Sequence, residues 1–307
     1  MKNPLLILLL TVASFCGSAQ EDARDKAKVF GCLPYQENTF IKQTEVRIAD
    51  WFGYLYSVNE EDAFQDDDFE DAEVRTMLPK EIDQSNKFLI DIFLRIWTDE
   101  WKNTKTTWNK KTIKTFPLYL NKIEKKELEK INRFLNKPIT GLTHFQVQEY
   151  LSWQGEELDN LLSDADDFHH QVELIPIQLY DTLLSKYTAG LRAAEDDNGV
   201  KLVVGDSVNT QGCQLYNFKG NGCPAEKQRL ALYGTLVGPV SVYSYNPDVN
   251  GFYNLMGNVA EMSATKGVAK GGHYEMYGSE ILKTEGLNYD QPSKLIGFRY
   301  LVKLIKN

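Results

Sequence analysis

The sequence predicts an α+β fold in which short strands and a few packed helices are joined by long irregular loops. Strand-like runs lie near both ends of the chain, at residues 40–42 and 296–305. Between them, segments such as residues 143–153 space apolar side chains three or four apart, as in an amphipathic helix. The third observation is residues 250–262, NGFYNLMGNVAEM, where glycines, amides and acids alternate with apolar residues. Glycine permits the tightly folded backbone that such a loop needs.

Helices are predicted in the first half of the chain. The 40–42 strand leads to Thr44, the predicted N-cap of a helix. Its buried stripe consists of apolar residues three or four apart: Ile48, Trp51, Phe52 and Leu55. Residues 87–101 and 123–135 also have helical spacing. Thr143 is the predicted cap of a further helix. The predicted inward-facing residues of that helix are Phe145, Val147, Tyr150, Leu151 and Trp153.

Shorter elements are predicted in the second half. A strand at Leu174 is followed by Pro176 and a helix that contains Tyr180 and Leu183. Further strands are predicted at residues 201–204, 237–245 and 296–305. His169 and His170 stand among aspartates, but adjacent histidines rarely bind one metal ion without strain. A polar loop is therefore expected there.

Composition and charge exclude two classes of partner. The 307 residues are 42% hydrophobic, enough for one large domain with a buried core. The formal net charge of -9 argues against nucleic acid and anionic membrane surfaces, because both require a basic face. Residues 60–73 are strongly acidic and are expected to form a solvated insertion.

Residues 1–19 have the layout of a secretory signal peptide. Lys2 precedes an apolar run that ends at Phe15, and small residues follow. Cleavage would leave residues 20–307 as one exported domain, located in the periplasm, at the outer membrane or outside the cell. No later segment has the length of a membrane helix. Cys16 leaves lipid attachment as an alternative, which the bulky Phe15 disfavours.

Three cysteines follow the predicted signal peptide. Cys213 and Cys223 bracket a loop rich in glycine and asparagine, and a local disulfide is expected between them in an oxidising compartment. Cys32 is then left over. It is expected to be a small buried apolar residue.

Six segments follow one another in a recognisable order. They are TEVRIADWFGYL (44–55), PITGLTHFQVQEYLSW (138–153), LIP (174–176) with Tyr180, GFYNLMGNVAE (251–261), KGGHY (270–274) and GFR (297–299). Their order resembles that of the formylglycine-generating-enzyme, or sulfatase-modifying-factor, family. The resemblance covers most of the chain after the signal peptide. It implies a C-type-lectin-like fold with small antiparallel sheets.

The resemblance also implies a structural calcium ion in the 250–262 stretch. Its ligands would be the side chains of Asn254 and Glu261 and the carbonyl oxygens of Gly257 and Val259. Calcium prefers such hard oxygen donors, at about 2.3–2.6 Å. Alternatively, Asn254 and Glu261 only hydrogen-bond the loop's own backbone.

The family's catalytic groups have no counterpart in this chain. Its oxidation of a substrate cysteine needs a copper-binding cysteine pair after the KGGHY position, and residues 272–307 contain no cysteine. Its iron-dependent relatives use a histidine-rich domain, whereas this chain has four histidines. No catalytic residue is therefore predicted from the resemblance. His273, in the family's serine position, defines a candidate pocket with Tyr253, Tyr274 and Tyr277. It could act there as an acid or base, or be a hydrogen-bonded structural histidine.

The resemblance implies an exported, non-catalytic protein that binds an envelope or secretion-system protein, as family members in secretion and gliding apparatus do. Two alternatives are an enzyme that uses the pocket around His273 and a lectin-like carbohydrate binder that uses the calcium loop.

Overall fold

A computed structural model of the chain describes residues 31–36, 38–51, 54, 133, 135–162, 168–189, 191–195, 201–205, 216–219, 238–248, 250–282 and 285–306. Several predictions fall outside these residues. They concern the signal peptide with Cys16, the acidic run 60–73, the helix at 87–101, most of the helix at 123–135, and the Cys213–Cys223 disulfide. They stay predictions.

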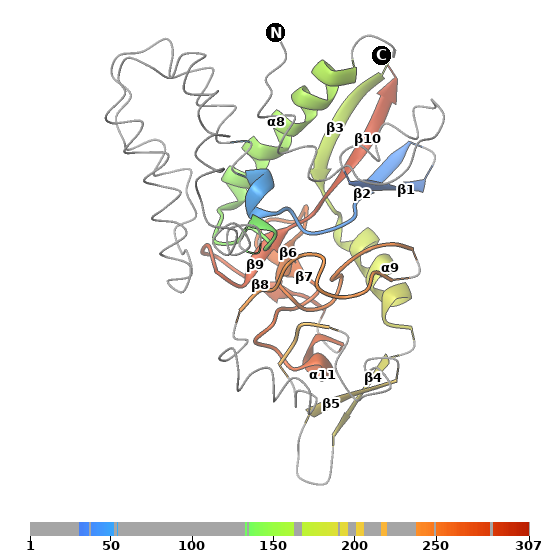
Figure 1. Cartoon of the computed structure of the whole chain (residues 1–307), viewed down its shortest axis with the longest axis vertical. Coiled ribbons are helices and arrows are strands. Elements are labelled where there is room, and N and C mark those ends of the chain that lie inside the picture. The colour runs from blue at the N-terminus through green and yellow to red at the C-terminus, as the bar shows by residue number, and fades with distance from the viewer. Residues whose placement is uncertain are drawn as a thin grey trace, which may run out of the picture.

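The first sheet has the strand order β1-β2-β10-β3, and all its pairs are antiparallel. Its strands are β1 (Cys32–Gln36), β2 (Thr39–Lys42), β3 (Phe168–Leu174) and β10 (Tyr300–Lys306). The strand predicted at residues 40–42 is thus confirmed. Helix α8 (His144–Leu162) runs alongside β3 in Figure 1. The α+β class predicted from the sequence is confirmed by this mixture of small sheets and helices.

The second sheet has the strand order β8-β7-β6-β9. Its strands are β6 (Ala260–Met262), β7 (Val268–Lys270), β8 (Leu287–Asn288) and β9 (Ile296–Phe298). Its strand β9 is followed directly in the chain by β10 of the first sheet. The β6–β9 pair is parallel. The single strand predicted at residues 296–305 is therefore wrong. Arg299 divides it into β9 and β10, which belong to different sheets, because its side chain is committed to interior contacts described below.

In Figure 1, α9 lies beside the second sheet, and β4, β5 and α11 lie below it. Helix α9 (Ile177–Tyr187) follows Pro176 as predicted, and it buries Tyr180 and Leu183. Strands β4 (Leu191–Glu195) and β5 (Lys201–Gly205) form a two-stranded ribbon, which confirms the strand predicted at 201–204. A short helix, α11 (Gly278–Ile281), follows the KGGHY segment.

An aromatic cluster joins the helices to both sheets. The ring of Tyr150, on α8, stacks on Trp51 at a centroid distance of 5.7 Å. Tyr54 and Phe298 meet the same ring edge-on at 5.5 and 5.4 Å. Edge-on and stacked aromatic pairs stabilise a core beyond the area that they bury. Tyr300, on β10, lies 6.4 Å from the same ring, so the cluster connects the helix that begins at Ile48, α8 and both sheets.

The predicted N-cap at Thr44 is wrong. The helix begins at Ile48, and the carboxylate of Asp50 accepts the backbone N–H of Arg47 at 3.0 Å. Residues 44–46 stay extended because they pair elsewhere. The N–H of Val46 donates to Phe298 at 2.9 Å, and the carbonyl of Val46 accepts the N–H of Ile139 at 2.9 Å.

The cap of α8 is confirmed. The N–H of Gln146 donates to the hydroxyl of Thr143 at 3.1 Å, and the N–H of Thr143 donates to the side-chain oxygen of Gln146 at 2.9 Å. This reciprocal pair is a capping box. Val147, Tyr150 and Leu151 are buried as predicted.

Phe145 does not face the interior, contrary to the prediction. Its side chain is 70% exposed. It lies in the first turn of α8. The cap residue Thr143 precedes it, and the buried residues Gln146 and Val147 follow it. At about 100° per residue, Phe145 lies on the opposite side of the helix from Val147, Tyr150 and Leu151, so the helical period itself directs it outward.

We expect Thr143→Ala to lower the free energy of unfolding by about 1 kcal/mol, because it removes one half of the capping box. Urea unfolding followed by circular dichroism measures this loss. Ser152→Ala, at an exposed position inside the same helix, is the control and should not destabilise the protein. Equal losses in both variants would contradict the capping role.

Two further loop and strand predictions are corrected. His169 and His170 lie in β3 instead of a polar loop, and the Nδ1 atoms of both contact the carboxylate of Asp159, at 2.5 and 2.7 Å. Conversely, residues 238–245 form turns instead of the predicted 237–245 strand. The backbone groups of Val240 and Val242 pair with the side chains of Asn258 and Asn254 in the 250–262 stretch. These hydrogen bonds replace those that a neighbouring strand would make.

Candidate functional site

The 250–262 stretch folds as a tight loop because several residues adopt left-handed backbone angles. Asn254 and Asn258 have φ values of 51° and 58°. Asparagine tolerates this region better than most residues because its short side chain can hydrogen-bond locally. Asp248 starts the loop, since its carboxylate accepts the N–H groups of Asn250 and Phe252 at 2.9 and 2.8 Å.

Gly257 brings the loop into close contact with residue 217. Its φ is +81°, and a Cβ at this position would lie 2.5 Å from the carbonyl oxygen of Asn217. The same carbonyl accepts the N–H of Asn258 at 2.7 Å. Only glycine fits this approach without displacing the backbone.

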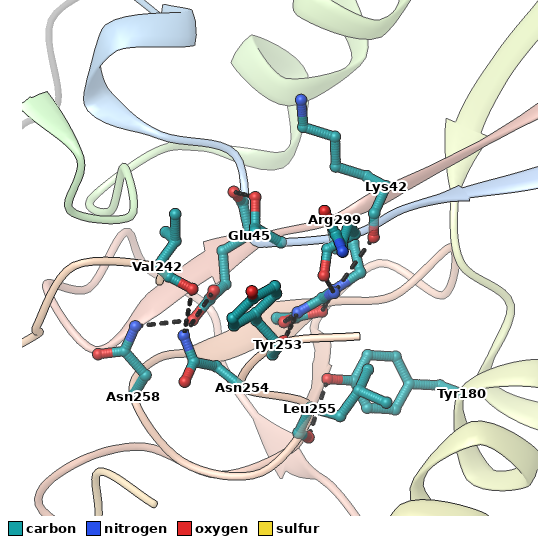
Figure 2. Close-up of polar contacts among 12 residues, drawn as sticks. Lys42, Glu45, Tyr180, Val242, Tyr253, Asn254, Leu255, Asn258 and Arg299 are labelled. Atoms are coloured by element: carbon teal, nitrogen blue, oxygen red, sulfur yellow. Dashed lines mark hydrogen bonds and ion pairs between the residues drawn. The ribbon is translucent and has the colours of Figure 1, made fainter. Parts of the chain in front are cut away.

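Two asparagine amides converge on the carboxylate of Glu45. The Nδ2 of Asn258 donates to Oε1 at 2.7 Å, and the Nδ2 of Asn254 donates to Oε2 at 3.2 Å. Figure 2 shows both amides reaching toward Glu45 from the loop. All three side chains are buried. The loop is thus tied to the segment that follows β2, more than 200 residues earlier in the chain.

Backbone partners fix the orientation of both amides. The carbonyl of Val242 accepts the second hydrogen of Asn254 Nδ2 at 3.0 Å. The N–H of Val240 donates to Asn258 Oδ1 at 2.9 Å, and Asn217 donates to the same oxygen at 3.0 Å. A carbonyl can only accept and an N–H can only donate, so the nitrogens of both amides must face Glu45.

Arg299 and Glu261 form a fully buried ion pair. Nε of Arg299 lies 3.0 Å from Oε2 of Glu261, and Nη2 lies 2.8 Å from Oε1. Both side chains are essentially inaccessible, with exposed fractions of 0% and 1%. This two-point geometry matches the planar fork of a guanidinium to a carboxylate.

The other N–H groups of Arg299 bind the backbone of two segments. Nη1 donates to the carbonyls of Gln43 at 2.6 Å and Lys42 at 3.2 Å, and Nη2 donates to the carbonyl of Tyr253 at 2.6 Å. With the contacts to Glu261, every N–H of the guanidinium has an acceptor. Arg299 therefore fastens the end of β2 and the 250–262 stretch to the point where β9 becomes β10.

Burial raises the pKa of Glu45 to about 7. The positive charge of Arg299 opposes this shift, whereas the negative charge of Glu261 adds to it. Burial alone would lower the pKa of Arg299, but the Glu261 carboxylate raises it above its ordinary value, so the guanidinium stays charged. Two carboxyl groups and one cation thus share a site away from water.

The side chains present do not fit the calcium site that the resemblance implies. Both oxygens of Glu261 accept from Arg299, and the guanidinium would repel a divalent cation beside it. Asn254 directs its amide hydrogens, not its oxygen, at Val242 and Glu45. Neither side chain hydrogen-bonds only the loop's own backbone, which was the alternative expectation. Calcium binding through Gly257 and Val259 stays a prediction that this arrangement does not favour.

The candidate pocket residues Tyr253 and His273 make separate contacts. The ring of Tyr253 meets Tyr243 at 5.5 Å, and its N–H donates to the carbonyl of Gln43 at 3.0 Å. His273 instead lies beside Tyr274, at a ring distance of 6.3 Å. Within the described part of the chain, no hydrogen bond or ring contact joins Tyr253 to His273.

His273 is held by the backbone. Its Nδ1 accepts the N–H of Glu275 at 3.2 Å, and burial lowers its pKa. The Glu275 carboxylate pairs with Lys294 at 3.4 Å. No hydrogen bond or ion pair links His273 to a carboxylate among the residues that the structure describes. This geometry matches the hydrogen-bonded structural histidine that was weighed against an acid or base.

Sequence reasoning assigned no role to Glu45, Asn258 or Arg299. Each stood inside a quoted motif, in TEV, GNV and GFR respectively. The sequence pattern that could have identified these residues is an ionisable or amide residue within a largely apolar motif. Such a residue is expected to be buried and therefore to have a hydrogen-bond partner. The identity of the partner depends on the fold.

No helix in the described ranges is both long and apolar enough to cross a membrane. No family model matches the chain, and no curated protein matches it.

Solved structures that are similar to part of it include two bacterial proteins. PvdO from Pseudomonas aeruginosa is 14% identical, with a TM-score of 0.35, over 55% of this chain and 63% of PvdO. Treponema denticola variable protein 1 is 14% identical, with a TM-score of 0.34, over 55% of this chain and 72% of that protein. The chain thus spans less than two thirds of the length of PvdO.

Proposed function

We propose that this protein is an exported, non-catalytic binding or assembly module of the bacterial cell envelope, with a C-type-lectin-like fold of the formylglycine-generating-enzyme type. The observation that carries the proposal is the fate of the polar residues in the 250–262 stretch. Asn254, Asn258 and Glu261 point into the protein and bind Glu45 and Arg299. The stretch therefore acts as a scaffold that holds the surrounding loops in place. We assign partner binding to the surface of the protein.

The sequence supports the same proposal. Residues 272–307 contain no cysteine, so the copper-binding pair on which the family's oxidation chemistry depends has no counterpart there. Its first 19 residues have the layout of an export signal. The proposed partner is a protein of a secretion or gliding apparatus, by analogy with non-catalytic family members.

Export gives the first prediction of this proposal. We expect the mature protein, isolated from the envelope or medium, to begin at Gln20, with a mass that lacks residues 1–19. Intact-mass spectrometry measures this directly. A mature chain that starts at a lipid-modified Cys16 would support the envelope location but place the cleavage after Phe15 instead of after Ala19. A full-length cytoplasmic chain would contradict the proposal.

Partner binding is tested by site-specific crosslinking in the native host. Phe145 is a suitable probe because it is a large apolar side chain exposed at the start of α8. A photo-crosslinking amino acid at position 145 should give a defined adduct with an envelope protein. The same group at Ser152, an exposed position on α8, reports chance encounters. We would abandon the proposal if crosslinkers at exposed positions of every described element gave only monomer.

A further inference from the structure

The buried polar site carries an uncompensated charge if all its groups are ionised. Glu45 and Glu261 would contribute two negative charges, and Arg299 contributes one positive charge. Burying a charge without a counter-charge is costly, so proteins neutralise it with a partner ion or a proton. The site therefore requires one more positive charge, which is either a metal ion or a proton.

The donors that face Glu45 exclude a metal ion from its carboxylate. Asn254 and Asn258 present amide hydrogens to it, and their backbone partners Val242 and Val240 prevent the amides from turning round. A cation needs oxygen atoms in those positions. Within the described residues, no group of three or more histidine, cysteine, aspartate or glutamate side chains could hold a metal ion.

Glu45 is better placed than Glu261 to take up a proton. Both oxygens of Glu261 face the charged guanidinium, and a proton there would break the ion pair. Glu45 receives only neutral amide donors, which a carboxylic acid can also accept. The contact of Oε2 is the longer one, 3.2 Å against 2.7 Å at Oε1.

We propose that a proton on Glu45, not a metal ion, completes the charge balance of the buried site, so that the 250–262 stretch is fastened without calcium and loosens when Glu45 ionises. The proton exchanges with solvent water, and no other bond changes. Charged and titratable groups on each surrounding element interact electrostatically with Glu45. They are Arg299 between β9 and β10, Glu261 on β6, Tyr180 and Tyr187 on α9, and Tyr243 in the preceding loop.

The raised pKa of Glu45 gives the sign of the pH dependence. Between the ordinary glutamate value of about 4.3 and about 7, the native state keeps a proton that the unfolded chain has lost. Stability therefore falls as the pH rises through this window. The unfolding equilibrium constant should increase by up to about tenfold per pH unit. Burial lowers the pKa of His144 and His273, whose contributions therefore have the opposite sign.

The test compares wild type with Glu45→Gln and with the control Glu156→Gln, which changes an exposed glutamate on α8. Thermal unfolding is recorded at pH 5, 6, 7 and 8, in calcium chloride and in EDTA. We expect the wild-type and Glu156→Gln curves to lose stability relative to Glu45→Gln as the pH rises, equally in calcium and EDTA.

Two outcomes overturn the proposal. One is stabilisation by calcium that EDTA removes, which would show that a metal ion completes the site. The other is a Glu45→Gln variant with the same pH dependence as the control. If Glu45→Gln does not fold, infrared difference spectra of the wild-type protein decide the question. A buried carboxylic acid band at pH 5 that is lost by pH 8 supports the proposal, and no such band refutes it.

Discussion

Replacing Arg299 with methionine is expected to lower the free energy of unfolding by about 3–5 kcal/mol, the usual range when one partner of a buried ion pair is removed. Methionine fills much of the volume but leaves Glu261 charged and unpaired in the interior. It also leaves the carbonyls of Lys42, Gln43 and Tyr253 without their donor. Urea unfolding followed by tryptophan fluorescence measures the loss.

Lys294→Met is the matched control for Arg299→Met. Lys294 pairs with Glu275 at 3.4 Å, but both side chains are substantially exposed, so the pair is worth at most about 1 kcal/mol. We further expect Glu261→Met combined with Arg299→Met to be less destabilised than Arg299→Met alone, because no unpaired charge remains at that position. Losses of the same size in Arg299→Met and Lys294→Met would show that the buried pair has no special weight.

Gly257→Ala is expected to destabilise the protein by about 3 kcal/mol. Left-handed backbone alone costs a residue with a Cβ about 1–2 kcal/mol. At this position the new Cβ would also lie 2.5 Å from the backbone oxygen of Asn217. That oxygen cannot move away freely, because it accepts the N–H of Asn258. The variant should therefore loosen both the loop and the segment around residue 217.

Gly31→Ala separates the two contributions. Gly31 has a φ of +66°, but a Cβ there would meet only the flexible end of Lys42, at 3.6 Å. We expect it to lose the backbone contribution alone, about 1–2 kcal/mol. Chemical denaturation of both variants under one condition gives the difference. A loss in Gly257→Ala no greater than in Gly31→Ala would mean that the contact with Asn217 relaxes at little cost.

The elements that the sequence predicted well are those set by neighbouring residues. The capping box at Thr143 and the helix after Pro176 depend on contacts within four positions of the chain. Such signals are complete within a short window of sequence. The apolar residues of β2, Phe40 and Ile41, are buried as a short apolar run predicts.

The incorrect predictions involve partners distant in the chain. The run 296–305 has the same alternation whether it forms one strand or two, and only the contacts of Arg299 with residues 42, 43, 253 and 261 divide it. The segment 237–245 also alternates like a strand, but asparagines 12 to 18 residues later bind its backbone.

The 250–262 stretch stood out in the sequence, but the partners of its polar residues did not. The order of motifs marked the 250–262 stretch as the centre of the fold. It could not reveal that Asn254 bonds to Glu45, 209 positions away, or that Glu261 bonds to Arg299. Pairings of this kind follow from the packing of loops, which no local pattern encodes.

The position of β10 has a consequence for the order in which the chain can fold. This strand lies between β2 and β3, so the first sheet cannot join its two halves until residues 300–306 are available. A chain that leaves the ribosome or crosses a membrane from its N-terminus would therefore keep this sheet incomplete until residues 300–306 emerge. For the exported protein proposed above, this delay would keep the chain unfolded enough to be translocated and would confine completion of the sheet to the far side.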